Sequence, residues 1–223
     1  MKHCLLLIVV WMLVTSPVVF AAEETCITCH QNLSSSVNLG HNFSDWKKSV
    51  HAVHHVGCAS CHGGNPQVSN PVEAHQGVLS SRKEKSLVYF QKVSETCGRC
   101  HKGEFEEFQK SAHYRTLQKT GKGPNCLTCH GAMATTILTY ADLDQTCSLC
   151  HGKPTRAAQA FQLLHSVKKS LDRYQKKMQS QKKEPSPEFT NRYNELQRKW
   201  HSFDVVSVIE MSKNLIQDLK NTK

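Results

Sequence analysis

Large aromatic side chains are scarce in this sequence: Phe, Trp and Tyr together make up 7% of its 223 residues. Long apolar runs are also scarce, and the one that stands out runs from Leu5 to Val14. Ten of the 11 cysteines fall in evenly spaced pairs, so almost no thiol is left for other roles. These shortages exclude a large core of ordinary side chains and, after the N-terminus, a membrane-spanning helix. Something other than side chains has to fill the interior.

The cysteine pairs belong to five CxxCH motifs. Their cysteines are Cys26, Cys29, Cys58, Cys61, Cys97, Cys100, Cys126, Cys129, Cys147 and Cys150, and the histidines that follow are His30, His62, His101, His130 and His151. Residues three and four apart share one face of a helical turn. Two such thiols can bond the two vinyl groups of a porphyrin, and the histidine then lies beneath the iron as its proximal ligand. The pattern predicts five covalently bound c-type haems.

Two other uses of paired cysteines fit the pattern less well. CxxC pairs also build zinc ribbons, and secreted chains pair cysteines in disulfides. Neither requires a histidine after every pair. With 14 histidines in 223 residues, five out of five by chance has odds on the order of one in a million. We therefore expect the haems to form the core and the haem-free chain to be largely unfolded.

The N-terminus resembles a secretory signal peptide. A short basic start precedes the apolar run, which is too brief to span a bilayer, and small residues follow at Ala21 and Ala22. We expect residues 1–21 to be removed, with cleavage after Ala22 as an alternative and an uncleaved membrane anchor as a further one. Cys4 would leave with the signal. The sequence thus predicts a periplasmic or secreted protein that does not span the membrane after cleavage.

The charge balance is basic, with a formal net charge of +10. Such an excess can indicate nucleic acid or anionic membrane as a partner. Five haems, however, bring about ten propionate charges, which roughly cancel it. We interpret the lysines and arginines as local counter-ions and expect no nucleic-acid partner.

Residues 22–153 form the predicted pentahaem-binding domain. Within it, 26–62 and 97–130 repeat one order of features: a haem motif, the pattern aromatic-x-Lys-Ser-x-His, a glycine and a second haem motif. Internal repetition of this kind indicates two related two-haem modules. A fifth haem motif follows at 147–151. The predicted fold class is mostly α with extensive loops, packed on haems, with little or no sheet.

Residues 154–223 have a different character. Apolar residues recur every three or four positions from Ala157 to Met178, Glu184 to Pro187 interrupts the pattern, and a second series runs from Phe189 to about Leu219. The sequence predicts two helices in an antiparallel hairpin. We expect this hairpin to cover the haems as a lid; a dimerisation coiled coil is the alternative.

Histidines outside the motifs are candidates for the second axial position on the irons. In order of preference they are His51, His113, His75, His165, His201, His41 and His55; His54 is the predicted bystander. His41, His75, His113 and His165 follow a motif histidine by 11 to 14 residues. A helix that continued out of each motif would carry them about three turns on, within reach of a neighbouring haem. Met133 could also ligate an iron, although packing against a porphyrin fits it better.

These motifs resemble those of the multihaem cytochromes grouped around cytochrome c554, hydroxylamine oxidoreductase and pentahaem nitrite reductase. The resemblance rests on the five CxxCH motifs, on the segments 46–52 and 61–64, and on Phe108 to His113. It implies a mostly helical fold with closely stacked haem pairs. The family contains enzymes and carriers. Its nitrite reductases typically have a lysine at the catalytic haem, whereas every motif here ends in histidine.

Two protein ligands on every iron would leave no position open for a substrate. We therefore expect an electron carrier and not an enzyme, one that relays electrons in anaerobic respiration. Its partners would be a quinol-oxidising membrane complex or another cytochrome on one side, and a terminal reductase or extracellular acceptor on the other. The alternatives are a small reductase of nitrogen or sulfur oxyanions with one five-coordinate haem, and a homo-oligomer that forms a haem wire.

Overall fold

The computed structural model describes residues 24–31 and 43–222, so the predicted signal peptide and His41 lie outside it. In these ranges the chain forms helices and turns and no strand, which confirms the mostly α fold class. The short helices are α1 (Thr25–His30), α2 (Phe43–Lys47), α3 (Val50–Val53), α4 (Ala59–His62), α5 (Pro71–Ala74), α6 (Val93–Gly98) and α9 (Cys126–His130). The longer ones are α7 (Lys102–Gln109), α8 (Ala112–Thr120), α10 (Tyr140–His151), α11 (Thr155–Ser180), α12 (Pro187–Trp200) and α13 (Val205–Asn221).

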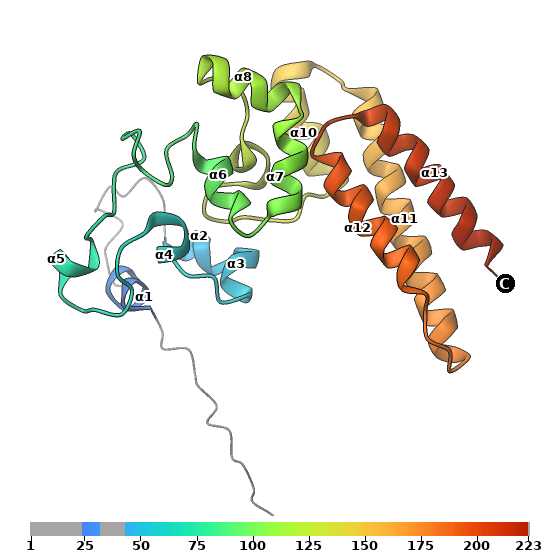
Figure 1. Ribbon diagram of the computed structural model, residues 1–223, viewed down its shortest axis with the longest axis horizontal. Helices are drawn as coiled ribbons and strands as arrows, with labels where there is room; N and C mark the ends of the chain where they lie inside the picture. Colours follow the sequence, from blue (N-terminus) through green and yellow to red (C-terminus); the bar gives the residue numbers. More distant parts are fainter. Residues whose placement is uncertain (1–23, 32–42, 223) are drawn as a thin grey trace, which may run out of the picture.

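The helices follow one another along the long axis of the molecule (Figure 1). Helices α1 to α5 lie at one end, α6 to α10 lie in the middle, and α11 to α13 form a bundle at the other end. No helix in the described ranges has the length and the apolar composition needed to cross a membrane.

The two repeated segments have the same local structure around their Lys-Ser-x-His pattern. Ser49 is the N-cap of α3 and accepts a hydrogen bond from the Ala52 backbone N–H at 3.1 Å. Ser111 is the N-cap of α8 and accepts one from the Tyr114 N–H at 3.0 Å. Serine is a favoured N-cap because its hydroxyl satisfies an amide that the helix itself leaves unpaired. Each cap fixes the histidine two residues on in the first helical turn.

Four of the motif helices end at the motif histidine. Helices α1, α4, α9 and α10 stop there, and after the last three comes a glycine with positive φ: Gly63 at 76°, Gly131 at 82° and Gly152 at 64°. Glycine reaches this backbone region without steric cost, whereas a side chain does not. The expected helices continuing out of the second, fourth and fifth motifs are therefore absent, and that prediction was wrong. His101 differs, because it is the N-cap of α7.

The C-terminal region contains three helices where the sequence predicted two. Helix α12 ends at Trp200, and α13 restarts at Val205 after a turn in which Phe203 has a φ of 56°. Asp204 caps the new helix by accepting hydrogen bonds from the Ser207 N–H at 3.3 Å and hydroxyl at 2.7 Å. The apolar rhythm runs across this turn, so periodicity alone could not reveal it. Helix α12 is antiparallel to α11, and α13 is parallel to α11, so the region is a bundle of three helices and not a hairpin of two (Figure 1).

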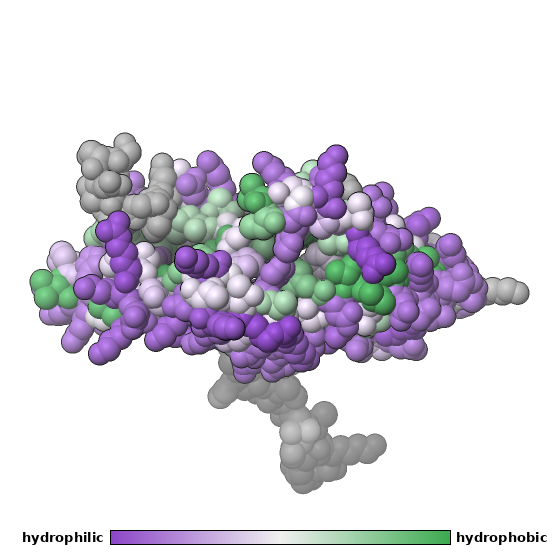
Figure 2. All heavy atoms as spheres, turned by 90° about the horizontal axis from the view of Figure 1, so that it is seen from above, coloured by the Kyte–Doolittle hydropathy of each residue, from purple (hydrophilic) through white to green (hydrophobic). Residues whose placement is uncertain are grey.

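Buried hydrophobic residues are distributed unevenly between the two parts of the chain. The bundle has its own core of ten, from Ala160 to Leu219, whereas the described part of 24–151 contains four: Val93, Phe108, Leu117 and Leu143. Large apolar side chains there stay exposed instead, among them Val53 at 71% and Leu149 at 77%. Figure 2 shows hydrophobic patches that interrupt a mostly hydrophilic surface. The side chains of the region that holds the cysteine motifs therefore do not form a continuous hydrophobic core.

The bundle joins this region through α12 and the turn that follows it. Lys199 Nζ lies 3.7 Å from Glu107 Oε2 on α7. The Phe203 ring is 6.4 Å from the Phe108 ring, in an edge-to-face arrangement. The apolar faces of the three helices pack mainly on one another, and the turn 201–204 faces the motif region.

Candidate functional site

Four motif histidines each face a histidine from outside the motifs. The pairs are His30 with His75, His101 with His51, His151 with His113, and His130 with His201, and their ring centroids are 5.9, 6.2, 5.7 and 6.3 Å apart. None of these partners is close in sequence to its motif histidine. The fold therefore assembles four similar pairs from distant segments.

This spacing matches two imidazoles on opposite sides of one metal ion. Each metal–nitrogen bond is about 2 Å long, so the two nitrogens are about 4 Å apart and the ring centroids about 6 Å apart. In the pair His113–His151 the two Nε2 atoms are 3.4 Å apart, slightly closer than a metal requires. A small outward movement of either ring would accommodate it.

Three of the paired histidines are oriented by a hydrogen bond from Nδ1. His75 Nδ1 is 2.7 Å from the Pro71 carbonyl oxygen, His130 Nδ1 is 3.0 Å from that of Thr136, and His201 Nδ1 is 3.0 Å from that of Gln197. Because a carbonyl oxygen only accepts, the proton is on Nδ1 and the lone pair is on Nε2. Metal-bound histidines are typically held in this way.

Burial favours the neutral form of three of the partner histidines. It lowers the pKa of His51, His113 and His201. The facing motif histidine lowers the pKa further in each case, although a hydrogen bond to Gln197 partly opposes the effect at His201. Neutral imidazole is the form that binds a metal. The surroundings of the pairs thus favour the ligating state.

The motif cysteines are free thiols, and no disulfide joins any two of the ten in the described chain. In that part of the chain, no three or more His, Cys, Asp or Glu side chains converge to hold a metal by themselves. A zinc ribbon needs four protein ligands around one ion. Pairs of histidines suit a metal that takes its remaining four ligands from a porphyrin. The donor set therefore fits haem iron better than zinc.

Thiols of the first three motifs lie close enough to those of an adjacent motif in the sequence to affect their pKa. The pKa of Cys58 is raised to about 11, first by burial and then by the Glu24 carboxylate and the Cys26 thiol. Burial also raises the pKa of Cys61, and the next contribution comes from Cys100. The first motif thus adjoins the second, and the second adjoins the third.

The same adjacency continues to the last motif. A hydrogen bond between the Cys97 and Cys126 thiols raises the pKa of Cys97 and lowers that of Cys126. The pKa of Cys129 is raised to about 11 by burial and then by Cys147 and Cys150. Groups attached at these thiols would follow one another in sequence order from the first motif to the fifth.

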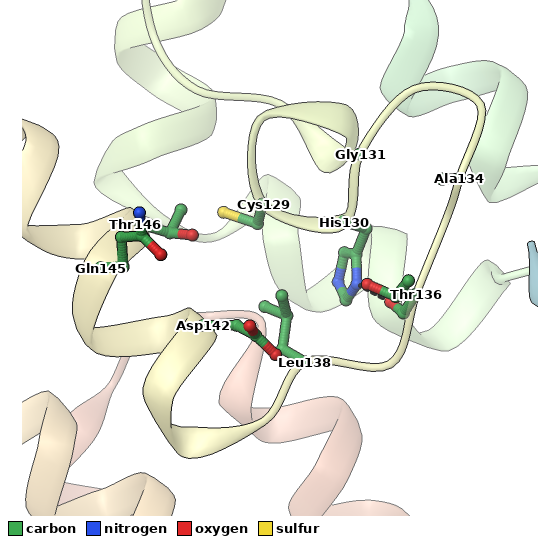
Figure 3. Close-up of a pocket in the computed structure, with 9 residues that line it drawn as sticks. All are labelled: Cys129, His130, Gly131, Ala134, Thr136, Leu138, Asp142, Gln145 and Thr146. Carbon is green, nitrogen blue, oxygen red and sulfur yellow. Dashed lines mark hydrogen bonds between the residues drawn. The ribbon is translucent and has the colours of Figure 1, made fainter. Parts of the chain in front are cut away.

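A cavity of about 230 Å³ lies between the fourth motif and α10. Figure 3 shows the Cys129 sulfur and the His130 ring directed into the same space, with Asp142, Thr146 and Leu138 on the opposite wall. A porphyrin bonded to Cys129 would lie here, because a group attached at that thiol has to lie over His130. Thiol, imidazole and open space coincide there.

The other candidate residues lie outside these pairs. His165 is exposed on α11, and His54 and His55 are exposed after α3. Met133 is half-buried in the turn that follows α9. His41 lies outside the described residues.

One residue of the site was missed by the sequence interpretation. The Phe203 ring stands 4.3 Å from the His113 ring, edge to face. Its signal in the sequence is Asp204 followed three residues later by Ser207, a helix-start pattern that falls inside the apolar rhythm. A break recognised there would have placed Phe203 at a corner.

Comparisons with known proteins add nothing to the geometry. No protein-family model, curated protein or solved structure matches this chain. The resemblance to multihaem cytochromes therefore remains a prediction drawn from its motifs.

Proposed function

We propose that this protein is a periplasmic pentahaem c-type cytochrome that relays electrons between a quinol-linked donor and a periplasmic or extracellular acceptor. The observation that carries the proposal is the set of four facing histidine pairs, each at the separation of two axial ligands on one iron. Each pair contains a motif histidine whose two cysteines are free to hold the porphyrin.

Shortage of a protein core supports the same proposal. The described part of 24–151 contains four buried hydrophobic residues and exposes others such as Leu149, which lies between the two cysteines of the last motif. Porphyrins at the five motifs would cover such side chains and supply the missing apolar interior.

Iron with two imidazole ligands has no position open for a substrate. Such an iron gains and loses electrons without making or breaking bonds to other molecules, and it has a lower potential than iron with a methionine ligand. The sequence-order adjacency of the thiols from Cys26 to Cys150 supports a continuous path of porphyrins. Transfer of electrons along this path is the function that the geometry supports best.

Electron paramagnetic resonance of the oxidised holoprotein tests this proposal. We expect low-spin ferric signals from bis-histidine irons and no change on adding nitrite, hydroxylamine or cyanide. A high-spin signal that responds to one of these ligands would contradict the carrier role and favour a reductase with one five-coordinate haem. An absence of ferric haem signals would refute the proposal altogether.

A further inference from the structure

His113 lacks the hydrogen bond from Nδ1 that orients His201. His201 and its partner His130 both donate from Nδ1 to backbone carbonyls, each at 3.0 Å. The Nδ1 atom of His113 is buried and has no hydrogen-bond partner. The histidine pair of the fourth motif therefore has hydrogen-bonded Nδ1 atoms, whereas the partner histidine of the fifth motif has an Nδ1 atom without a partner.

Phe203 takes the place of that hydrogen bond. Its ring packs on His113 with centroids 4.3 Å apart and planes at 77°. The same ring lies 6.4 Å from Phe108 and 6.0 Å from Trp200. His113 is thus held by an apolar contact on the side of the molecule where the bundle meets α7 and α8.

The backbone of Phe203 is held in a strained conformation to bring this about. Its φ of 56° is in the left-handed region, which side chains other than glycine rarely adopt. Hydrogen bonds on both sides fix the turn: the Phe203 N–H donates to the Trp200 carbonyl at 2.9 Å, and Asp204 caps α13 through Ser207. The strain is kept because the flanking helix ends determine the corner.

The difference at Nδ1 has a consequence for the bound iron. An Nδ1–H that donates to a carbonyl makes the imidazole a stronger electron donor, which stabilises ferric iron and lowers the reduction potential. This push acts on both ligands of the iron at His130 and is missing from His113. A dry, apolar contact also disfavours the more highly charged ferric state.

We propose that Phe203 is a positioning residue that seals His113 Nδ1 from water and so gives the iron between His113 and His151 a higher potential than its neighbour between His130 and His201. This rests on the proposed function, because it takes the pairs to be haem ligands. With haem bound, one electron would pass from the iron at the fourth motif, which would be oxidised, to the iron at the fifth, which would be reduced.

Three variants of the full-length holoprotein test the role of Phe203. Phe203→Ala removes the ring and admits water to Nδ1, so one of the five potentials should fall. Phe203→Gly should cause the same fall while relieving the backbone strain, and Phe203→Leu should keep the potential because it keeps an apolar seal. The measurement is a potentiometric titration monitored by electron paramagnetic resonance. The potential at which one low-spin ferric signal disappears should fall, and the potentials of the other signals should not change. Unchanged potentials in the alanine and glycine variants would overturn the inference.

A second measurement uses the unaltered protein, which avoids any failure of a variant to fold. Haem methyl signals are assigned to the fifth motif by their nuclear Overhauser contacts with the Phe203 ring protons. During stepwise reduction, this haem should become ferrous before the haem of the fourth motif, and the reverse order would overturn the inference. Intact mass separates the two levels of failure. Five haems with the wrong order contradict this inference alone, whereas a chain without haem contradicts the proposed function.

Discussion

Each proposed axial ligand depends on an imidazole that is neutral and aimed by its surroundings. At His75, His130 and His201 a backbone carbonyl takes the Nδ1 proton and turns Nε2 toward the partner ring. At His51 and His113 the aim comes from a serine cap that places the histidine in the first turn of a helix. Local hydrogen bonds and helix caps thus orient histidines whose partners are distant in the sequence.

Substitution of His201 by alanine should open the iron of the fourth motif. One low-spin ferric signal should be replaced by a high-spin signal, and cyanide or carbon monoxide should bind about one equivalent per chain, because one axial position is vacant. The matched control is His165→Ala, since His165 is exposed on α11 outside the pairs. A spectrum unchanged by the first variant, or changed by the second, would count against the pairing of His130 with His201.

Loss of the Ser111 cap should destabilise α8 and disturb His113. Ser111→Ala removes the acceptor for the Tyr114 N–H, and such a loss typically costs about 1 kcal/mol of unfolding free energy. Guanidinium unfolding of the holoprotein, followed by circular dichroism, measures the cost. Ser166→Ala is the control. The Ser166 hydroxyl donates to the Gln162 carbonyl at an exposed position of α11, so its removal should change the free energy by less than about 0.5 kcal/mol.

Residue types were easier to infer from the sequence than residue pairs. The CxxCH spacing is local, and so is the Lys-Ser-x-His pattern that marks His51 and His113. Which histidine faces which motif depends on the paths of segments many residues long, as in His201 with His130. The spacing of histidines along the chain does not reveal those paths. The same spacing argument placed His165 above His201 among the candidate ligands.

Among the helices, the turns between elements do most to position the site. Gly63, Gly131 and Gly152 end motif helices in positive-φ conformations. Gly123 acts differently, because a Cβ there would lie 2.4 Å from the Leu117 amide nitrogen and 2.7 Å from the His113 carbonyl oxygen. The chain before the fourth motif therefore passes directly against the backbone of α8.

Gly123→Ala should push α8 and His113 away from their places. A clash with backbone atoms cannot be relieved by a side-chain rotation, and overpacking of this kind costs about 1–3 kcal/mol. Gly57 occupies the equivalent position of the first repeat, where the atoms nearest to a Cβ would be those of the Glu24 carboxylate at 2.2–2.4 Å. That side chain can move, so Gly57→Ala should cost clearly less. Thermal unfolding of both holoproteins gives the comparison, and equal losses would contradict it.

Helical periodicity predicted the C-terminal elements only in part. The apolar repeat and the Pro185-Ser186-Pro187 break located α11 and the start of α12. The division at Phe203 was missed because apolar residues continue in phase through it, and only the cap formed by Asp204 and Ser207 marks the new start. The chain can thus change direction between two helices while the helical period of its apolar residues continues.

On the scale of the whole molecule, the two parts of the chain differ in what holds them together. The bundle buries ten hydrophobic residues of its own, which is the usual source of stability for packed helices. The described part of 24–151 buries four. Its helices are mostly short, and short helices are marginal in water without tertiary packing.

The haem-free protein should therefore keep structure in the bundle and lose it elsewhere. Expression without the c-type maturation apparatus, followed by hydrogen exchange, should show protected amides in α11 and α13 and rapid exchange in α3 to α9. The holoprotein is the control, and there both regions should be protected. Equal protection of both regions in the haem-free chain would mean that side chains suffice for the interior.

The most direct test of the account is the intact mass of the matured chain under denaturing conditions, together with its visible spectrum. Covalent attachment at the five motifs predicts a mass increased by five haems and sharp α and β bands on adding dithionite. A mass without those additions, or a spectrum that dithionite leaves unchanged, would contradict the account, because the facing histidines would then have no iron between them.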